Sequence, residues 1–338
     1  MSDRLRLYLS ESHDPWFNLA VEDWIFHDMQ DVDQVLYLWR NRETVVIGRS
    51  QNPWVECQLE KMKSDGVKLA RRQSGGGAVF HDLGNTNFTF LSKKSAYDKL
   101  RNLNIILRAL SDLGVEAKAH GRNDLLVKSP EGEWRKISGS AFKEKSDRAF
   151  HHGTLLLNAN LTSLADYLRP NKKKLQAKGI QSVRSRVMNC KEVADGIEHG
   201  KVCDAIIKDF KLTYGSDVEV EVISPENISA LPGLEHRLQH MASVSWRLGQ
   251  TLPFTHQMEA RFEWGNVDIR LQVKGNTIEA AQVYSDCLYP EFIAELENSF
   301  VGVMYSTEAL ITALTVLRKP KHAVFIDDLM KLLESESE

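Results

Sequence analysis

Three consecutive glycines constrain this chain more than any other feature of its sequence. They occupy positions 75–77 in the stretch Arg-Arg-Gln-Ser-Gly-Gly-Gly-Ala-Val-Phe-His-Asp, which spans residues 71–82. Residues without a Cβ allow positive φ angles and let another group lie directly against the main chain. Strand-forming residues resume immediately after the glycines, so the sequence predicts a loop stretched between two strands.

The two arginines before the glycines favour an anion-binding loop over an ordinary turn. Each guanidinium offers a planar set of donors that suits a carboxylate or a phosphate. The stretch matches neither the phosphate loop G-x-x-x-x-G-K-[ST] nor the dinucleotide fingerprint G-x-G-x-x-G. A tight turn between strands remains the alternative. We therefore expect the loop to hold a mononucleotide or an acyl phosphate in some other way.

Composition narrows the class of protein. A chain of 338 residues, 42% of them hydrophobic, can bury one large core or a large and a small one. Its formal net charge of −3 argues against a nucleic-acid binder of the usual basic kind. The four cysteines form no C-x-x-C pair, which predicts a reducing compartment and neither disulfides nor a zinc site. No apolar segment suits a signal peptide or a membrane helix, so we expect a cytoplasmic protein.

Hydrophobic periodicity predicts alternating strands and helices. Expected helices span residues 15–29, 53–65, 97–113 and 202–214, and expected strands span 5–9, 35–40, 44–48, 67–69, 87–91, 125–127, 135–141, 153–157 and 218–223. A short polar turn separates the strands 35–40 and 44–48, which is typical of a hairpin. Together these elements predict an α+β fold with a mixed, largely antiparallel sheet flanked by helices.

The pattern changes near residue 250. Residues 245–250, followed by Pro253, resemble a linker. Beyond them we expect a three-stranded meander, with Gly-Asn turns at 265–266 and 275–276, and then two or three helices. The sequence therefore predicts a large domain over residues 1–246 and a small α+β accessory domain over residues 254–338.

Two further clusters place charged side chains beside expected strands. Asn123 and Asp124 precede an apolar strand, where a Mg²⁺ or ribose ligand can project from the strand end; an ordinary polar turn shows the same pattern. Lys136 leads into Ser-Gly-Ser-Ala, and these small residues leave room for a ligand whose phosphate and carboxylate the ammonium would neutralise. A surface lysine at a strand end is the alternative.

Aromatic residues, histidines and a basic segment complete the candidates. Trp39 and Phe80 either line an apolar slot for a hydrocarbon or belong to the core. His151 and His152 are neighbours on an expected strand, so they point to opposite faces and cannot chelate one metal together. Residues 171–189 carry six basic and no acidic residues, which indicates either a solvated loop or a mobile, function-bearing one.

In their order along the chain, these motifs resemble those of the lipoate–protein ligase A family, within the biotin/lipoate A/B protein ligase superfamily. The motifs are Arg-Arg-x-Ser-Gly-Gly-Gly-Ala-Val-Phe-His-Asp, Gly-Arg-Asn-Asp, Lys-Ile-Ser-Gly-Ser-Ala and His-His-Gly-Thr-Leu-Leu. The resemblance begins at Asp14-Pro15-Trp16 and extends into the C-terminal domain, so it covers nearly the whole chain.

The resemblance implies an ATP-dependent, AMP-forming ligase that works in two steps. Free (R)-lipoate attacks the α-phosphate of ATP, giving lipoyl-AMP and pyrophosphate. The ε-amine of a specific lysine on a lipoyl domain then takes the lipoyl group and releases AMP. The implied partners are the lipoyl domains of 2-oxoacid dehydrogenase E2 proteins and the glycine cleavage H protein, with Mg²⁺ as cofactor. The expected protein is a monomer that binds neither nucleic acid nor membranes.

The same resemblance implies roles for individual residues. Lys136 is the expected catalytic residue, placed between the carboxylate and the α-phosphate, and Asp124 is the candidate Mg²⁺ ligand. Residues implied for ATP and lipoyl-adenylate are Arg72, Gly77, Ala78, Val79, Phe80, Asn85, Asn123, Asp124, Lys136 and Thr154. Residues implied for lipoate are Trp39, Arg72, Ser74, Gly75, Gly76, His81, Lys136 and Ala141. The basic segment 171–189 corresponds to the family's adenylate-binding loop, and we expect it to close over the reactive anhydride.

Three rival functions differ from the ligase in a sequence feature. An octanoyl transferase that uses acyl carrier protein shares the fold, and some such enzymes need a thiol; none of the four cysteines lies in the motifs. Biotin ligases carry a Gly-Arg-Gly-Arg-x-Gly loop, which is absent here. A non-catalytic lipoate or nucleotide binder would lose Lys136 or the glycine loop with its Arg72, and both are present.

Overall fold

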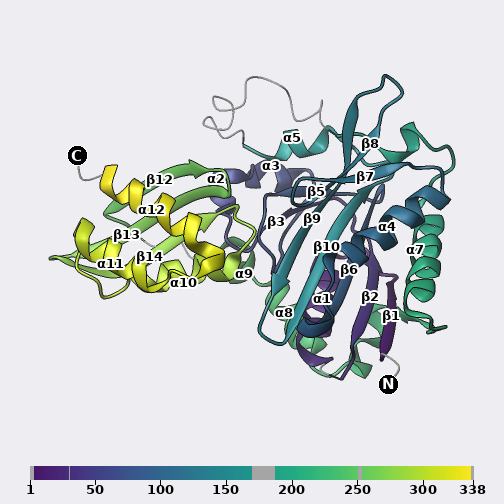
Figure 1. The fold of residues 1–338 in the computed structure, drawn as a ribbon, viewed down its shortest axis with the longest axis horizontal. Helices are drawn as coiled ribbons and strands as arrows, with labels where there is room; N and C mark the ends of the chain where they lie inside the picture. Colours follow the sequence, from purple (N-terminus) through teal and green to yellow (C-terminus); the bar gives the residue numbers. More distant parts are fainter. Residues whose placement is uncertain (1–3, 30, 170–186, 250–252, 336–338) are drawn as a thin grey trace.

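The computed structural model describes residues 4–29, 31–169, 187–249 and 253–335 (Figure 1). Within these residues the main sheet has eight strands in the order β11-β1-β2-β6-β10-β9-β8-β7. β1 pairs in parallel with β2 and β11, and all other neighbours pair antiparallel, which confirms the predicted mixed, largely antiparallel sheet. The strands are β1 (Leu5–Ser10), β2 (Gln34–Trp39), β6 (Asn85–Lys93), β7 (Ala117–His120), β8 (Asp124–Lys128), β9 (Trp134–Glu144), β10 (Arg148–Leu156) and β11 (Val220–Ile223).

Helices cover both faces of this sheet (Figure 1). α1 (Pro15–Asp28) and α8 (Leu234–Ala242) pack on one face, and α4 (Lys99–Asp112) and α7 (His199–Tyr214) pack on the other. The alternation of a strand divides the two cores: Leu36 and Leu38 of β2 join the α4/α7 core, while Tyr37 joins the α1/α8 core. The Asp14 side chain accepts from the first backbone amides of α1, as its position before a proline predicts.

A second, three-stranded sheet carries the glycine loop. It consists of β3 (Thr44–Ile47), β4 (Lys68–Arg71) and β5 (Val79–His81), with β3 in the middle. The predicted hairpin between residues 35–40 and 44–48 is therefore wrong, because β2 and β3 belong to different sheets. β2 is already flanked by β1 and β6, so it has no free edge with which β3 could pair. The loop from β4 to β5 holds the three glycines.

The structure of two segments differs from the sequence-based prediction. The expected helix over 53–65 consists of α2 (Pro53–Glu56) and α3 (Leu59–Ser64), because Cys57 leaves the helix to form a bridge with Leu168 beyond α5 (Ser163–Tyr167). The expected linker at 245–250 contains a helix, α9 (Val244–Leu248). The Trp246 indole donates to the carbonyl of Arg71 at 2.9 Å, which fixes α9 against β4.

The C-terminal residues form their own core. β12 (His256–Phe262), β13 (Gly265–Lys274) and β14 (Thr277–Ser285) form a meander that packs against α10 (Pro290–Phe300), α11 (Thr307–Val316) and α12 (Ala323–Ser335). The turn predicted at 265–266 is displaced, because Gly265 already pairs with Phe262. The turn consists of Glu263 and Trp264, and the Trp264 side chain is buried in this core. None of the described helices has the length and apolarity to cross a membrane.

Candidate active site

The three glycines of the loop meet different surroundings. A Cβ on Gly75 would lie 2.1 Å from the carbonyl oxygen of Cys287 in the C-terminal domain, so this position packs main chain against main chain. Gly76 has a φ of 93° and its N–H donates to the same carbonyl at 3.1 Å. A Cβ on Gly77 would meet nothing within 4 Å. Two glycines thus serve the contact with the protein's own C-terminal domain, and Gly77 alone leaves open space.

Arg72 shapes the loop from inside. Its Nη2 donates to the carbonyls of Gly75 and Gly77 at 2.6 and 2.8 Å, and its Nη1 donates to Val46 O at 3.2 Å. Burial lowers the pKa of this guanidinium to about 10. The sequence predicted a side chain that contacts the ligand directly; the structure directs its donors to the carbonyls of the loop.

The Arg71 guanidinium also points toward main-chain carbonyls. Its guanidinium donates to the carbonyls of Arg49 and Gln51, both at 2.7 Å, and to Trp246 O at 2.8 Å. Burial lowers its pKa to about 10. In this structure main-chain carbonyls occupy the donors of both arginines, and their role at the mouth of an anion site stays a prediction.

Lys136 and Asp124 come together at the opposite end of the site. Lys136 Nζ lies 2.6 Å from Asp124 Oδ1, and each side chain is about a third exposed. A Cβ on Gly139 would lie 3.0 Å from the same Nζ, so the glycine makes room for the ammonium. The Gly139 amide donates to Thr154 Oγ1 at 3.3 Å. Three residues that the sequence motifs named separately thus form one polar group.

Two buried amides on β6 face this group. Asn85 and Asn87 lie on the same face of the strand, and Asn87 is paired with Thr154 of β10. Asn85 Nδ2 donates to Asn87 Oδ1 at 3.0 Å, which leaves Asn85 Oδ1 and Asn87 Nδ2 buried and without a hydrogen bond. Unpaired buried polar atoms are costly unless a ligand or water satisfies them. Asn87 was missed by the sequence analysis, although its spacing of two from Asn85 was a usable signal. Asn123 instead holds the backbone, donating to Ser140 O at 3.0 Å.

The predicted lipoate residues lie further along the same face of the sheet. Ala141 of β9 is paired with His152 of β10, two residues beyond Gly139, or about 7 Å along the strand. Trp39 lies beside His81, with ring centroids 6.0 Å apart. Burial lowers the pKa of His81 to about 3, so its ring is neutral.

Trp39 and Phe80 do not share one slot. The Phe80 ring stacks on Tyr167 at 5.8 Å and belongs with the core of the small sheet, whereas Trp39 belongs with the α1/α8 core. The alternation along β5 explains the difference, because Phe80 and His81 point to opposite faces. His81 takes the place beside Trp39 that the sequence suggested for Phe80.

The two neighbouring histidines point to opposite faces, as predicted. His151 is packed among Phe88, Phe90 and Phe142 in the α4/α7 half, and burial lowers its pKa to about 3. His152 faces the glycine loop and lies within hydrogen-bond distance of Ser74, with Nε2 and Oγ 2.7 Å apart. The pair holds no shared metal site.

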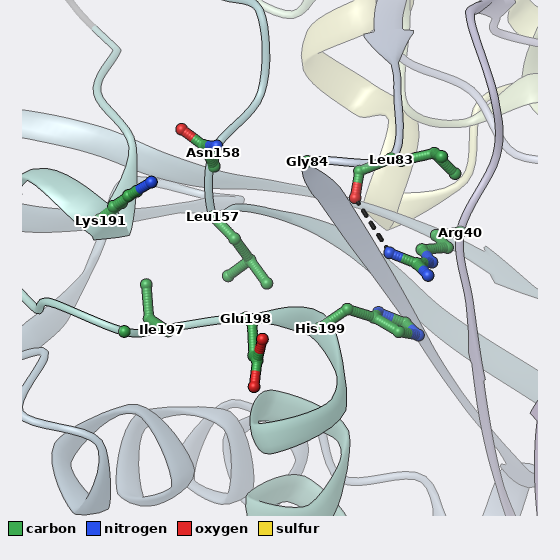
Figure 2. A pocket seen from close by; sticks show the side chains of 10 residues that line it. Arg40, Leu83, Gly84, Leu157, Asn158, Lys191, Ile197, Glu198 and His199 are labelled. Carbon is green, nitrogen blue, oxygen red and sulfur yellow. Dashed lines mark hydrogen bonds between the residues drawn. The ribbon is translucent and has the colours of Figure 1, made fainter.

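A cavity of about 460 Å³ lies beyond the ends of β6 and β10 (Figure 2). Figure 2 shows Lys191 and Arg40 on either side of Leu157, and Arg40 Nη1 donates to Leu83 O at 3.3 Å. None of the site residues predicted from the sequence lines it. Its wall consists of Arg40, Leu83, Gly84, Leu157, Asn158, Lys191, Gly196, Ile197, Glu198 and His199.

Metal ligands are sparse in the described part of the chain. It contains no group of three or more His, Cys, Asp or Glu side chains suited to a metal. Asp124 is a single carboxylate, which fits the way Mg²⁺ binds when substrate phosphates supply most other ligands. Of the basic segment, residues 171–186 lie outside the described residues; Val187 pairs with Lys136, and the Met188 amide donates to Lys136 O at 3.0 Å.

Known proteins match both parts of the chain. The model of the lipoyl protein ligase A/B catalytic domain matches residues 14–211, and that of the bacterial lipoate protein ligase C-terminus matches residues 251–333. LipL1 of P. falciparum, solved in complex with lipoate, is 31% identical with a TM-score of 0.85, covering 97% of this chain and 98% of that one.

Two further solved structures resemble the larger part of the chain. A bipartite lipoate protein ligase from Thermoplasma acidophilum, described with its E2 lipoyl domain, is 29% identical with a TM-score of 0.63, covering 75% of this chain and 98% of that one. A lipoate-protein ligase A bound with ATP is 26% identical with a TM-score of 0.61, covering 74% and 99%.

Proposed function

The chain belongs to the lipoyl protein ligase A/B family, and we propose that it activates free lipoate with ATP and transfers the lipoyl group to a lysine of a lipoyl domain. The polar group around Lys136 carries this proposal. A half-buried ammonium beside a carboxylate, a threonine and two amides that each keep one unpaired buried atom suits a substrate that brings phosphate and carboxylate together. Relatives with bound lipoate and with bound ATP support both substrates.

In the first step Lys136 leaves Asp124 and bridges the attacking carboxylate and the α-phosphate. Negative charge builds on the phosphate in the transition state, so a cation held there stabilises the transition state more than the ground state. Asn85, Asn123 and Thr154 orient the nucleotide. The main chain from Gly77 through Ala78 and Val79 to Phe80 lies against the adenylate.

Mg²⁺ has one ligand from the described residues in this proposal. Asp124 would hold it together with the phosphates of ATP, since Mg²⁺ is commonly bound by one or two carboxylates plus phosphate oxygens. The ion would neutralise charge on the triphosphate. Release of Asp124 from Lys136 frees both groups at once for their separate tasks.

The hydrocarbon tail of lipoate follows the face of the sheet away from Lys136. It passes Ala141 and lies near Trp39 and His81, whose rings supply apolar surface. Ser74, Gly75 and Gly76 belong to the loop that forms the wall beside it. Arg72 acts on this wall through the loop carbonyls that it holds.

In the second step the ε-amine of the acceptor lysine attacks the lipoyl carbonyl and AMP leaves. We assign both steps to residues 1–246 and an accessory role to residues 254–338, with segment 171–189 as the lid. The acceptors are lipoyl domains of 2-oxoacid dehydrogenase E2 proteins and the glycine cleavage H protein, in a cytoplasmic monomer. The relative from Thermoplasma acidophilum, described with its E2 lipoyl domain, supports this class of partner.

The cysteines weaken the rival in which a thiol takes the acyl group from acyl carrier protein. Cys57, Cys190, Cys203 and Cys287 are all free and buried. Burial raises the pKa of the first three thiols to about 12 and that of Cys287 to about 11, so none supplies a thiolate at neutral pH.

ATP–pyrophosphate exchange tests the proposal. Purified protein is given ATP, Mg²⁺ and labelled pyrophosphate with lipoate, octanoate or biotin in turn. Lipoate-dependent exchange is the expected result, because acid activation releases pyrophosphate reversibly. Absence of exchange with every acid would contradict activation and favour the carrier-protein transferase or the non-catalytic binder.

A further inference from the structure

A buried carboxylate on α1 begins a chain of contacts that ends in the glycine loop. Glu22 Oε1 lies 2.8 Å from His152 Nδ1, although 130 residues separate them in sequence. His152 Nε2 lies 2.7 Å from Ser74 Oγ, which accepts from Arg72 Nε at 3.0 Å. None of the four residues is more than 7% exposed. We call these four residues the relay.

The carboxylate and the guanidinium fix the direction of the hydrogen bonds at the two ends of the relay. Glu22 Oε1 also accepts from Thr89 Oγ1 at 2.7 Å, as a carboxylate oxygen does. Since the carboxylate accepts, His152 Nδ1 carries a proton and donates it to Glu22. A guanidinium can only donate, so the Ser74 oxygen accepts from Arg72 Nε, and Ser74 Oγ and His152 Nε2 share the hydrogen bond between them.

The relay also links two buried groups of opposite charge, the Glu22 carboxylate and the Arg72 guanidinium. Burial lowers the pKa of Arg72, and the negative charge of Glu22 opposes this effect. A buried cation without a counter-charge is strongly destabilising. Glu22 therefore supplies counter-charge to the arginine that holds the loop carbonyls, with His152 and Ser74 between the two charges.

A serine, a histidine and a glutamate in this order also occur in hydrolytic triads. Here the serine is fully enclosed and its oxygen already accepts from Arg72. A nucleophile needs a path to the carbonyl that it attacks. The relay therefore serves the shape of the loop rather than covalent catalysis.

We propose that Glu22 and His152 are positioning residues that hold the glycine loop in its ligand-binding shape through Ser74 and Arg72. The inference rests on the proposed ligase function, in which this loop lies against lipoate and adenylate. Breaking the relay lowers the fraction of molecules with a competent loop, and the apparent affinity falls by that fraction. The polar group around Lys136 is untouched, so kcat changes little.

A double-mutant cycle tests the proposal. Glu22→Gln and Ser74→Ala alter residues that have no hydrogen bond to each other, so coupling between them passes through the other members of the relay, His152 and Arg72. Each variant is expected to raise the KM for lipoate in pyrophosphate exchange by about 5- to 50-fold, with kcat within about twofold. The double variant is expected to show no more than the larger single effect. Effects that multiply, or an unchanged KM in Glu22→Gln, would overturn the proposal.

Asp23→Asn is the matched control. Asp23 is the next residue on α1, is also buried, and pairs with Arg237 at 2.6 Å instead of with the relay. This variant loses a buried carboxylate and its ion pair, so it reports general damage to the helix. Its KM for lipoate is expected to match the wild type.

Hydrogen–deuterium exchange without ligand separates this inference from the ligase function. Peptides covering residues 72–80 are expected to exchange faster in Glu22→Gln than in the wild type or in Asp23→Asn. If the loop of Glu22→Gln takes up deuterium faster while the wild type shows no pyrophosphate exchange, the role of the relay is supported and the ligase function is contradicted. Equal loop exchange in all three proteins overturns the relay whatever the activity.

Discussion

Arg72 and Lys136 are two cations on one binding face that occupy opposite kinds of surroundings. Arg72 is enclosed, and its donors reach the main-chain carbonyls of Gly75 and Gly77 within the glycine loop. Lys136 is about a third exposed and has Asp124 as its ion-pair partner, which can be exchanged for a substrate phosphate. A cation whose donors are bonded to the main chain is not free to move with a reacting substrate group. The comparison therefore assigns shape to Arg72 and chemistry to Lys136.

Loss of the enclosed cation has the largest expected effect on stability. Arg72→Met leaves the carbonyls of Gly75 and Gly77 without a donor and Glu22 without its counter-charge, at a cost of about 3–5 kcal/mol in the free energy of unfolding. Urea titration followed by circular dichroism measures it. Arg101→Met is the control, because Arg101 and its partner Asp98 are both 44% exposed; its expected cost is about 1 kcal/mol or less. Equal costs would break the comparison.

Glycine-to-alanine changes sharpen the comparison within the loop. Gly75→Ala puts a Cβ into the carbonyl of Cys287 and forces main chain apart, at an expected cost of about 2–3 kcal/mol. Gly77→Ala meets open space, so its unfolding free energy is expected to stay within about 0.5 kcal/mol while ligand affinity falls. Thermal unfolding and lipoate titration separate the two. A Gly77→Ala protein as unstable as Gly75→Ala would contradict the different roles of these glycines.

A third cation on the same face, Lys143, gives a pH-dependent effect. Burial lowers its pKa to about 8, below the ordinary value of 10.5. Folding therefore disfavours the protonated form of Lys143, which lowers the free energy of unfolding. This loss of stability is full below pH 8 and disappears as pH rises to about 10.5. Lys143→Met is expected to gain up to about 3 kcal/mol at pH 7 and nothing above pH 10.5. Urea unfolding at several pH values measures it; a gain independent of pH would contradict a charge effect.

The sequence predicted what depends on neighbours in the chain. The cap at Asp14 marked the start of α1, and the small residues after Lys136 located the polar group near the beginning of β9. Alternation correctly placed His151 and His152 on opposite faces. These features follow from spacing within one element, which a single sequence carries.

Contacts between residues that are distant in the chain could not be predicted from the sequence. Nothing near Gly75 signals that its missing Cβ accommodates Cys287, and nothing near Arg72 signals that its donors turn inward to loop carbonyls. The separation of β2 and β3 into different sheets has the same origin, because strand partners are chosen across the whole chain. The sequence analysis missed Glu22 because the role of its carboxylate depends on contact with His152, which is 130 residues away in the chain.

The most direct test of the division between shape and chemistry is Lys136→Ala in lipoate-dependent pyrophosphate exchange, with thermal unfolding measured on the same preparation. Lys128→Ala, an exposed lysine on the neighbouring strand β8, is the control. The account predicts that Lys136→Ala loses at least about 100-fold in exchange rate, with an unfolding temperature close to that of the wild type. A Lys136→Ala protein that exchanges at the wild-type rate would contradict it.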